Sequence, residues 1–304
     1  MASSVAQRID PGQRQVGVAP DGLSSRLATW SRRALRSPQL WIGGLCLAVL
    51  IGGALLAPWL APYSPSQTDA QASMQGPSLA HPFGTDKLGR DVLSRIMYGG
   101  RVSLSVSFLA VVLSSVVGVL LGLLSGYLLG WFDTITMRVM DGILAFPGLI
   151  LALAIAFALG PSVSSVVFAL AFVRIPPCAR IVRSQVIALR NHEFVTAAEV
   201  VGVAPGRIVA RHMLPNLIGV ILVQASIGAG AVIFAEASLG FLGLSVPPPT
   251  PTWGGMLQDG YAYLETHPYL SIIPGLIIFL AVLSFNFLGD GLHDVLDPQR
   301  RARR

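Results

Sequence analysis

The chain contains 304 residues, of which 53% are hydrophobic and only 12% are charged. Its mean hydropathy is +0.66. A soluble domain carries roughly 25% charged residues, and a disordered chain is poor in apolar residues. The composition excludes both classes and predicts a protein that lies mostly in a lipid bilayer.

Long segments without Asp, Glu, Lys or Arg indicate where the chain crosses the membrane. A helix needs about 20 apolar residues to cross the hydrocarbon layer, and five charge-free windows are long enough. The window between Asp141 and Arg174 is interrupted by Gly160-Pro161, a turn signal, and is predicted to hold two crossings. The sequence thus predicts an all-α integral membrane protein with six crossings, near residues 41–60, 103–128, 137–159, 163–186, 216–236 and 269–289.

The arginines predict the orientation of these crossings. Cytoplasmic loops retain an excess of Lys and Arg, and arginine is concentrated before the first crossing, after the last, and between crossings four and five. Both termini and the long loop between crossings four and five are therefore predicted to be cytoplasmic. The predicted parts are an N-terminal tail (1–38), a first transmembrane helix (39–61), an extracytoplasmic loop (62–100), a five-helix core (101–290) with a cytoplasmic loop (190–216), and a C-terminal tail (291–304).

Two enzyme motifs are incomplete. The only lysine, Lys87, is followed by leucine, so the chain lacks the Lys-Ser/Thr pair of a phosphate-binding loop. His192-Glu193 begins a zinc-protease motif, but Thr196 stands where the second histidine is required. We therefore expect no catalytic residue, metal site or cofactor in this chain, and no ATP binding by that route.

The cytoplasmic loop carries the most informative pattern. Asn191 is predicted to cap a short helix, and Val195, Ala198 and Val201 recur at a spacing of three, which predicts one apolar face. The run 202–206, Gly-Val-Ala-Pro-Gly, is predicted to end this helix. The pattern fits either an amphipathic helix on the lipid surface or a docking element for a soluble partner.

This loop resembles the EAA loop of permease subunits from ATP-binding-cassette (ABC) importers. The resemblance rests on Thr196-Ala197-Ala198, on Gly202 and on Leu214-Pro215 at the family's separation. Thr196 stands where the family usually has Glu, and His212 where it often has Ile. The chain is most similar to the second, C-type permease of the dipeptide/oligopeptide/nickel group. Further matching segments are 81–86 (HPFGTD), 88–91 (LGRD), 101–104 (RVSL), 236–244 (EASLGFLGL), 253–256 (WGGM) and 285–292 (FNFLGDGL).

The resemblance implies the type I importer permease fold in a bacterial cell membrane. It also implies a heterodimer with a second homologous permease, two cytoplasmic ATPases that hold ATP and Mg²⁺, and an extracytoplasmic solute-binding protein. The expected function is ATP-driven import of di- and oligopeptides, with no nucleic acid as partner. Two alternatives remain at this point: a nickel permease of the same group, and a carrier driven by an ion gradient. The second is disfavoured because the cores of the predicted crossings are expected to lack the ionisable groups of such carriers.

The resemblance also supplies candidate site residues. Ala197, Ala198 and Gly202 are expected to dock an ATPase, with Pro215 as a hinge into crossing five. The full candidate set for docking and coupling is Val195, Thr196, Ala197, Ala198, Val201, Gly202, Arg207, His212, Leu214 and Pro215. Glu236 and Asp259 are candidates for the pathway or its outer gate, although Glu236 could equally bond to the loop that follows it.

Two groups of charged residues are predicted to stabilise the structure. Asp91 and Arg95 are i,i+4 neighbours in a cluster with Asp86 and Arg90. Arg138 is predicted to pair with Asp133 or Asp141.

Overall fold

The computed structural model describes residues 37–296, and within this range every regular element is a helix. The elements are α2 (Pro38–Leu55), α3 (Ala57–Leu60), η1 (Ala70–Ala72), α4 (Val92–Leu128), α5 (Gly130–Leu144), α6 (Gly148–Leu159), α7 (Val163–Arg190), α8 (Glu193–Val200), α9 (Pro205–Ile208), η2 (Val209–Met213), α10 (Leu214–Phe241), α11 (Trp253–Tyr261) and α12 (Tyr269–Leu296). The predicted all-α class is confirmed. The predicted N-terminal tail lies almost wholly outside the described residues, as do residues 297–304 of the predicted C-terminal tail, whereas α12 continues past the expected end of the core at 290.

Five of the described helices are long and apolar enough to cross a membrane: α2, α4, α7, α12, and the continuous span Pro205–Phe241 that ends in α10. They match the predicted crossings one, two, four, six and five. Large apolar side chains on their outer faces are exposed, such as Val116 at 62% and Phe279 at 58%. These faces suit a lipid solvent, in which apolar exposure carries no penalty.

The third crossing differs from the prediction. The expected helix 137–159 is wrong, because α5 and α6 meet at a bend of 89°. Pro147 lies at the break and caps α6. Its ring disfavours a helical conformation for the preceding residue, and it has no N–H to continue the hydrogen-bond ladder. The described chain therefore has six spans only if this bent pair counts as one.

Close packing of α4 against α7 forms the centre of the bundle. Gly118, Gly122 and Gly126 lie one turn apart on the α4 face that meets α7. A Cβ atom at these positions would lie 2.7 Å from Cys178 Cβ, 2.6 Å from the Ala179 carbonyl oxygen and 2.7 Å from Val186 Cβ, respectively. In a membrane, such small residues let two helices approach closely enough to gain dispersion contacts.

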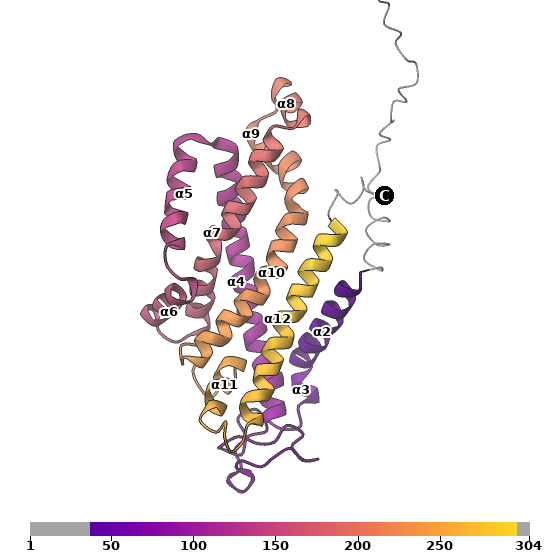
Figure 1. Ribbon diagram of the computed structural model, residues 1–304, viewed down its shortest axis with the longest axis vertical. Coiled ribbons are helices and arrows are strands. Elements are labelled where there is room, and N and C mark those ends of the chain that lie inside the picture. The colour runs from indigo at the N-terminus through magenta and orange to yellow at the C-terminus, as the bar shows by residue number, and fades with distance from the viewer. Residues whose placement is uncertain (1–36, 297–304) are drawn as a thin grey trace, which may run out of the picture.

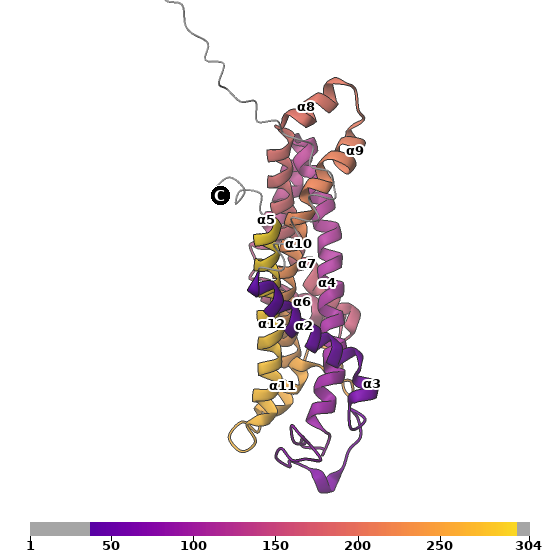
Figure 2. The ribbon, with the colours of Figure 1, turned by 90° about the vertical axis from the view of Figure 1, so that its right-hand side faces the viewer.

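The long helices run between two differently built ends (Figure 1). α8 and α9 stand beyond one end of the bundle (Figure 2), while α11 and the loop that follows α3 form the opposite end. α2 and α12 run antiparallel along one edge, so that a Cβ at Gly291 would lie 2.9 Å from Leu40 Cβ. The start of α2 and the end of α12 therefore lie together and point toward the α8 end (Figure 1).

Candidate functional site

The helix in the long loop between α7 and α10 forms as predicted, with different caps. α8 begins at Glu193 after His192, whereas Asn191 ends α7, so the predicted Asn191 cap is wrong. At its other end Gly202 has φ +80°, and its N–H donates to the Glu199 carbonyl at 3.0 Å. The Val203 N–H donates to the Ala198 carbonyl at 3.0 Å. This pair of bonds is a Schellman motif, which favours glycine at its left-handed position.

α8 rests on an apolar base. Val195 is completely buried and belongs to one cluster with Val186 of α7, Ile208 of α9 and Met213 of η2. Ala198 is half-buried at the edge of this cluster. Val201 is 82% exposed, so the predicted apolar face shared with Val195 and Ala198 ends before it. Burial on one side holds α8 in a fixed place relative to the two long helices that flank it.

The other side of α8 is open. Phe194, Val200 and Val201 are exposed large apolar side chains. Gly202 has no atom near the position of a Cβ. Of the remaining predicted docking residues, Thr196, Ala197, Arg207 and Pro215 are exposed, and His212 and Leu214 are half-buried. The structure thus brings the predicted set to one end of the molecule, with Val195 as its buried anchor.

A loosened helical turn joins α8 and α9 to the fifth crossing. Residues Val209–Met213 form a π-helical turn directly before α10, and Pro215 lies in the first turn of α10 as predicted. A proline cannot donate to the carbonyl four residues earlier and its ring crowds that carbonyl, which favours a wider turn. In the same turn, the side-chain amide of Asn216 donates to the His212 carbonyl at 2.6 Å.

At the opposite end, the first turn of α4 is fixed by Asp91. Its carboxylate accepts hydrogen bonds from the Ser94 N–H and hydroxyl, both at 2.7 Å, and lies 3.0 Å from His81 Nδ1. The predicted pair with Arg95 is absent. Asp91 caps the N-terminus of α4, and the Arg95 Nε lies 3.5 Å from the Asp86 carboxylate instead.

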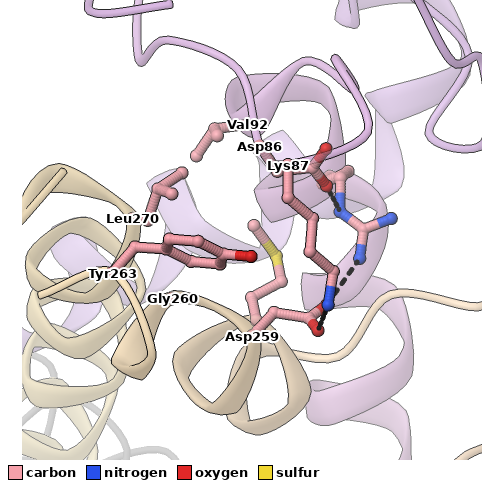
Figure 3. Close-up of a pocket in the computed structure, with 9 residues that line it drawn as sticks. Asp86, Lys87, Val92, Asp259, Gly260, Tyr263 and Leu270 are labelled. Carbon is pink, nitrogen blue, oxygen red and sulfur yellow. Dashed lines mark hydrogen bonds and ion pairs between the residues drawn. The ribbon is translucent and has the colours of Figure 1, made fainter. Parts of the chain in front are cut away.

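An ion-pair cluster ties α11 to the loop before α4. The Arg90 Nε donates to Asp86 at 2.6 Å, and the Lys87 ammonium lies 3.2 Å from Asp259. Figure 3 shows Lys87 and Asp259 reaching toward each other from these two segments. Asp259, a predicted outer-gate residue, is 40% exposed and also lies 3.7 Å from Arg90. The cluster lines a cavity of about 390 Å³ whose other wall is the proline-rich segment 247–251.

Glu236, the other predicted pathway residue, is completely buried inside the chain near the end of α10. The Ser245 hydroxyl donates to its Oε1 at 3.4 Å. The carboxylate is therefore bonded to the loop after α10, as the alternative interpretation held.

The pairs predicted for Arg138 are wrong. Asp133 pairs with Arg183 of α7, and Asp141 pairs with Arg180 of the same helix. Both acids lie on the side of α5 that meets α7, so α7 supplies the partners.

Sequence reasoning also missed Arg174, which lies near the middle of α7, so the predicted absence of charge from the crossing cores is wrong. Its Nη2 lies 3.4 Å from the Gln224 carbonyl of α10. In the sequence, Arg174 stands out only as the residue that ends one of the charge-free windows.

An all-helical bundle with five or six apolar spans is the organisation of a multi-pass membrane protein. Residues 118–302 match the family described as the binding-protein-dependent transport system inner membrane component. Residues 25–77 match the N-terminal transmembrane domain of oligopeptide transport permease C. The chain therefore belongs to this family of inner-membrane permeases of ABC importers, in its oligopeptide and dipeptide permease C group.

Curated relatives cover almost the whole chain. The dipeptide transport system permease protein DppC of Alkalihalophilus pseudofirmus is 42% identical over 288 residues, which is 93% of this chain and 94% of the relative. A putative peptide transport system permease protein of Brucella suis is 40% identical, with 93% and 95% covered. The glutathione transport system permease protein GsiD of Escherichia coli is 41% identical, with 93% of each chain covered. This membership overturns the alternative of a carrier driven by an ion gradient.

Proposed function

We propose that the chain forms one half of the pathway through which an ATP-driven importer moves short peptides, and that α8 couples it to a cytoplasmic ATPase. A second homologous permease forms the other half. The observation that carries the proposal is the two-sided construction of α8, buried through Val195 on one side and apolar but exposed on the other. This organisation has both termini and residues 190–216 in the cytoplasm and the loop 62–100 outside.

The contacts of α8 suggest how the motion is transmitted. Val195 packs against Val186 of α7 and against Ile208 and Met213, which lead into α10. A force on α8 therefore reaches both helices, and the π-helical turn before Pro215 is a natural place for the change of angle. The ATPases, which hold ATP and Mg²⁺, supply the energy through different contacts with the two permease states.

The substrate class follows from the named relatives. They are permeases for dipeptides, peptides and glutathione, which share a peptide backbone and a free carboxylate. Short peptides, delivered by an extracytoplasmic binding protein, are therefore favoured over nickel.

The test compares acidic substitutions on the exposed side of α8 with the same change elsewhere. Val200→Asp/Val201→Asp alters two side chains that are 83% and 82% exposed. Leu79→Asp alters an equally exposed apolar side chain in the loop at the other end and is the matched control. Each variant is co-expressed with its partner subunits, and copurification of the ATPases and ATP-dependent peptide uptake are measured.

We expect the double variant to lose ATPase copurification and uptake while still inserting into the membrane, and the Leu79 variant to retain copurification. Unchanged copurification in the double variant would contradict docking through α8 and would favour a helix that rests on lipid. Uptake that needs a proton gradient but no ATP would contradict the importer itself.

A further inference from the structure

Arg174 carries a positive charge halfway along a membrane-spanning helix, and in residues 37–296 no carboxylate pairs with it. The side chain is half-buried. Its Nε is buried without a hydrogen-bond partner in the same part of the chain. Arg174 lies about 16 Å along α7 from its first residue, at the helical rise of 1.5 Å per residue. A cation at this depth is costly unless it faces water or an anion, so it indicates a functional position.

α10 is shaped to accept this guanidinium. A Cβ atom at Gly228 would lie 1.8 Å from Arg174 Nη2 and 2.5 Å from its Cζ. Only glycine leaves that space, so the guanidinium lies directly across the α10 backbone. Within residues 37–296, its one hydrogen bond, 3.4 Å from Nη2 to the Gln224 carbonyl, is long for a charged donor. The contact with α10 thus leaves most of the donor capacity of Arg174 unused.

An apolar groove lies farther along α10, toward the α11 end. Gln224, Ala231, Phe234 and Ser238 recur at helical spacing and so lie on one face. Phe234 and Ser238 line the groove, which has a volume of about 540 Å³ between α6, α10 and α12. Its remaining wall residues are also almost all apolar. Arg174 does not line this groove; it meets α10 at Gly228, six residues before Phe234.

We propose that Arg174 binds the terminal carboxylate of a peptide as it crosses the bilayer, with the peptide side chains passing along the apolar face of α10. The proposal rests on the peptide-import function proposed above and adds the group that the pathway recognises. Arginine presents a planar fork of donors that matches both oxygens of a carboxylate. The terminal carboxylate is common to linear peptides of any sequence, so this contact discriminates by backbone and leaves the side chains free to vary.

The experiment measures the preference for a free carboxylate. The complete importer, with its partner permease, ATPases and binding protein, is reconstituted in proteoliposomes, and ATP-dependent uptake of a radiolabelled dipeptide is compared with that of its C-terminal amide. The ratio of the two rates is the readout. Because every variant uses the same binding protein, the binding protein's own preference cancels when ratios are compared.

Four variants are compared with the wild type. Arg174→Gln removes the charge, and Arg174→Lys keeps it without the fork. Gly228→Ala keeps Arg174 but places a methyl group where its guanidinium lies, whereas Gly219→Ala on the same helix would approach Leu296 no closer than 3.6 Å. We expect Arg174→Gln and Gly228→Ala to lower the acid-to-amide ratio about ten- to a hundredfold, Arg174→Lys to lower it less, and Gly219→Ala to leave it unchanged.

A ratio that stays constant while uptake of both compounds falls together would overturn the proposal, because Arg174 would then only tie α7 to α10. If Arg174→Gln fails to assemble, the difference between Gly228→Ala and Gly219→Ala decides the question in the same way. A wild-type importer that takes up neither compound would overturn the proposed peptide function, and this inference with it. Uptake by the wild type with unchanged ratios in the variants would overturn this inference alone.

Discussion

The guanidinium of Arg183 on α7 donates two hydrogen bonds of 2.5 Å to the carboxylate of Asp133 on α5. The two residues are 50 positions apart in the chain, so the pair joins two separate helices. The pair holds α5, the first helix of the bent third span, against α7, the fourth span.

We expect Asp133→Asn to lower the free energy of unfolding by about 1–3 kcal/mol, because it weakens a two-fold charge-assisted contact whose carboxylate is nearly buried, 11% exposed. The matched control is Asp141→Asn, whose pair with Arg180 is almost half exposed on both sides and is worth about 0–1 kcal/mol. Thermal unfolding in detergent measures both. Equal losses would show that burial does not distinguish the two pairs.

Gly202→Ala tests the end of α8. The added methyl group meets no atom, so any effect comes from the backbone, where φ of +80° costs a non-glycine residue about 1 kcal/mol. We expect reduced ATPase stimulation by loaded binding protein, because α8 would change its end geometry while the bundle stays intact. Gly206→Ala, which is also in open space but without a positive φ, is expected to keep full stimulation. Equal activity of the two variants would contradict a role for the Schellman motif.

In the ion-pair cluster at the α11 end, removing one acid is expected to lower stability, and salt is expected to restore part of the loss. Asp259→Asn leaves Lys87, Arg90 and Arg95 with Asp86 as the remaining acid in the contacts described, so repulsion should lower the unfolding temperature. About 1 M NaCl should restore part of the loss, because screening then acts within about 3 Å. Glu265→Gln, an exposed acid that follows α11, is the control. A loss that salt does not change would rule out repulsion as its cause.

Two glycine-to-alanine substitutions are expected to change the free energy of unfolding in opposite directions. At Gly122 the new Cβ would lie 2.6 Å from the Ala179 carbonyl oxygen, so α4 and α7 must separate and stability should fall by about 1–3 kcal/mol. At Gly44, in the interior of α2, no atom lies near the new Cβ. There the higher helix propensity of alanine should stabilise by up to about 1 kcal/mol. Unfolding in detergent measures both, and destabilisation of equal size would contradict the packing account.

Several features of this protein could be predicted because they depend on short segments. The apolar spans follow from the cost of placing charge in hydrocarbon, which is the same wherever the segment packs. The end of α8 at Gly202 follows from the local backbone preference of glycine. The bend between α5 and α6 is also marked locally by Pro147, which the prediction of a single helix over 137–159 did not take into account.

The partners of the charged side chains could not be predicted. Asp133, Asp141 and Asp91 each bond to a group different from the one that sequence proximity favoured, because helical spacing says nothing about which helix faces a given side. The surroundings of Arg174 also depend on the tertiary structure: within the described residues it meets the α10 backbone, and no carboxylate pairs with it.

By itself, the sequence determined that this is a helical membrane protein with a short helix between its fourth and fifth spans, since solvation by lipid and backbone preference act residue by residue. Only the tertiary structure decided which charges pair, that Val201 faces outward while Val195 is buried, and that Gly228 makes room for the Arg174 guanidinium. These outcomes depend on contacts between segments far apart in the chain, which no local pattern encodes.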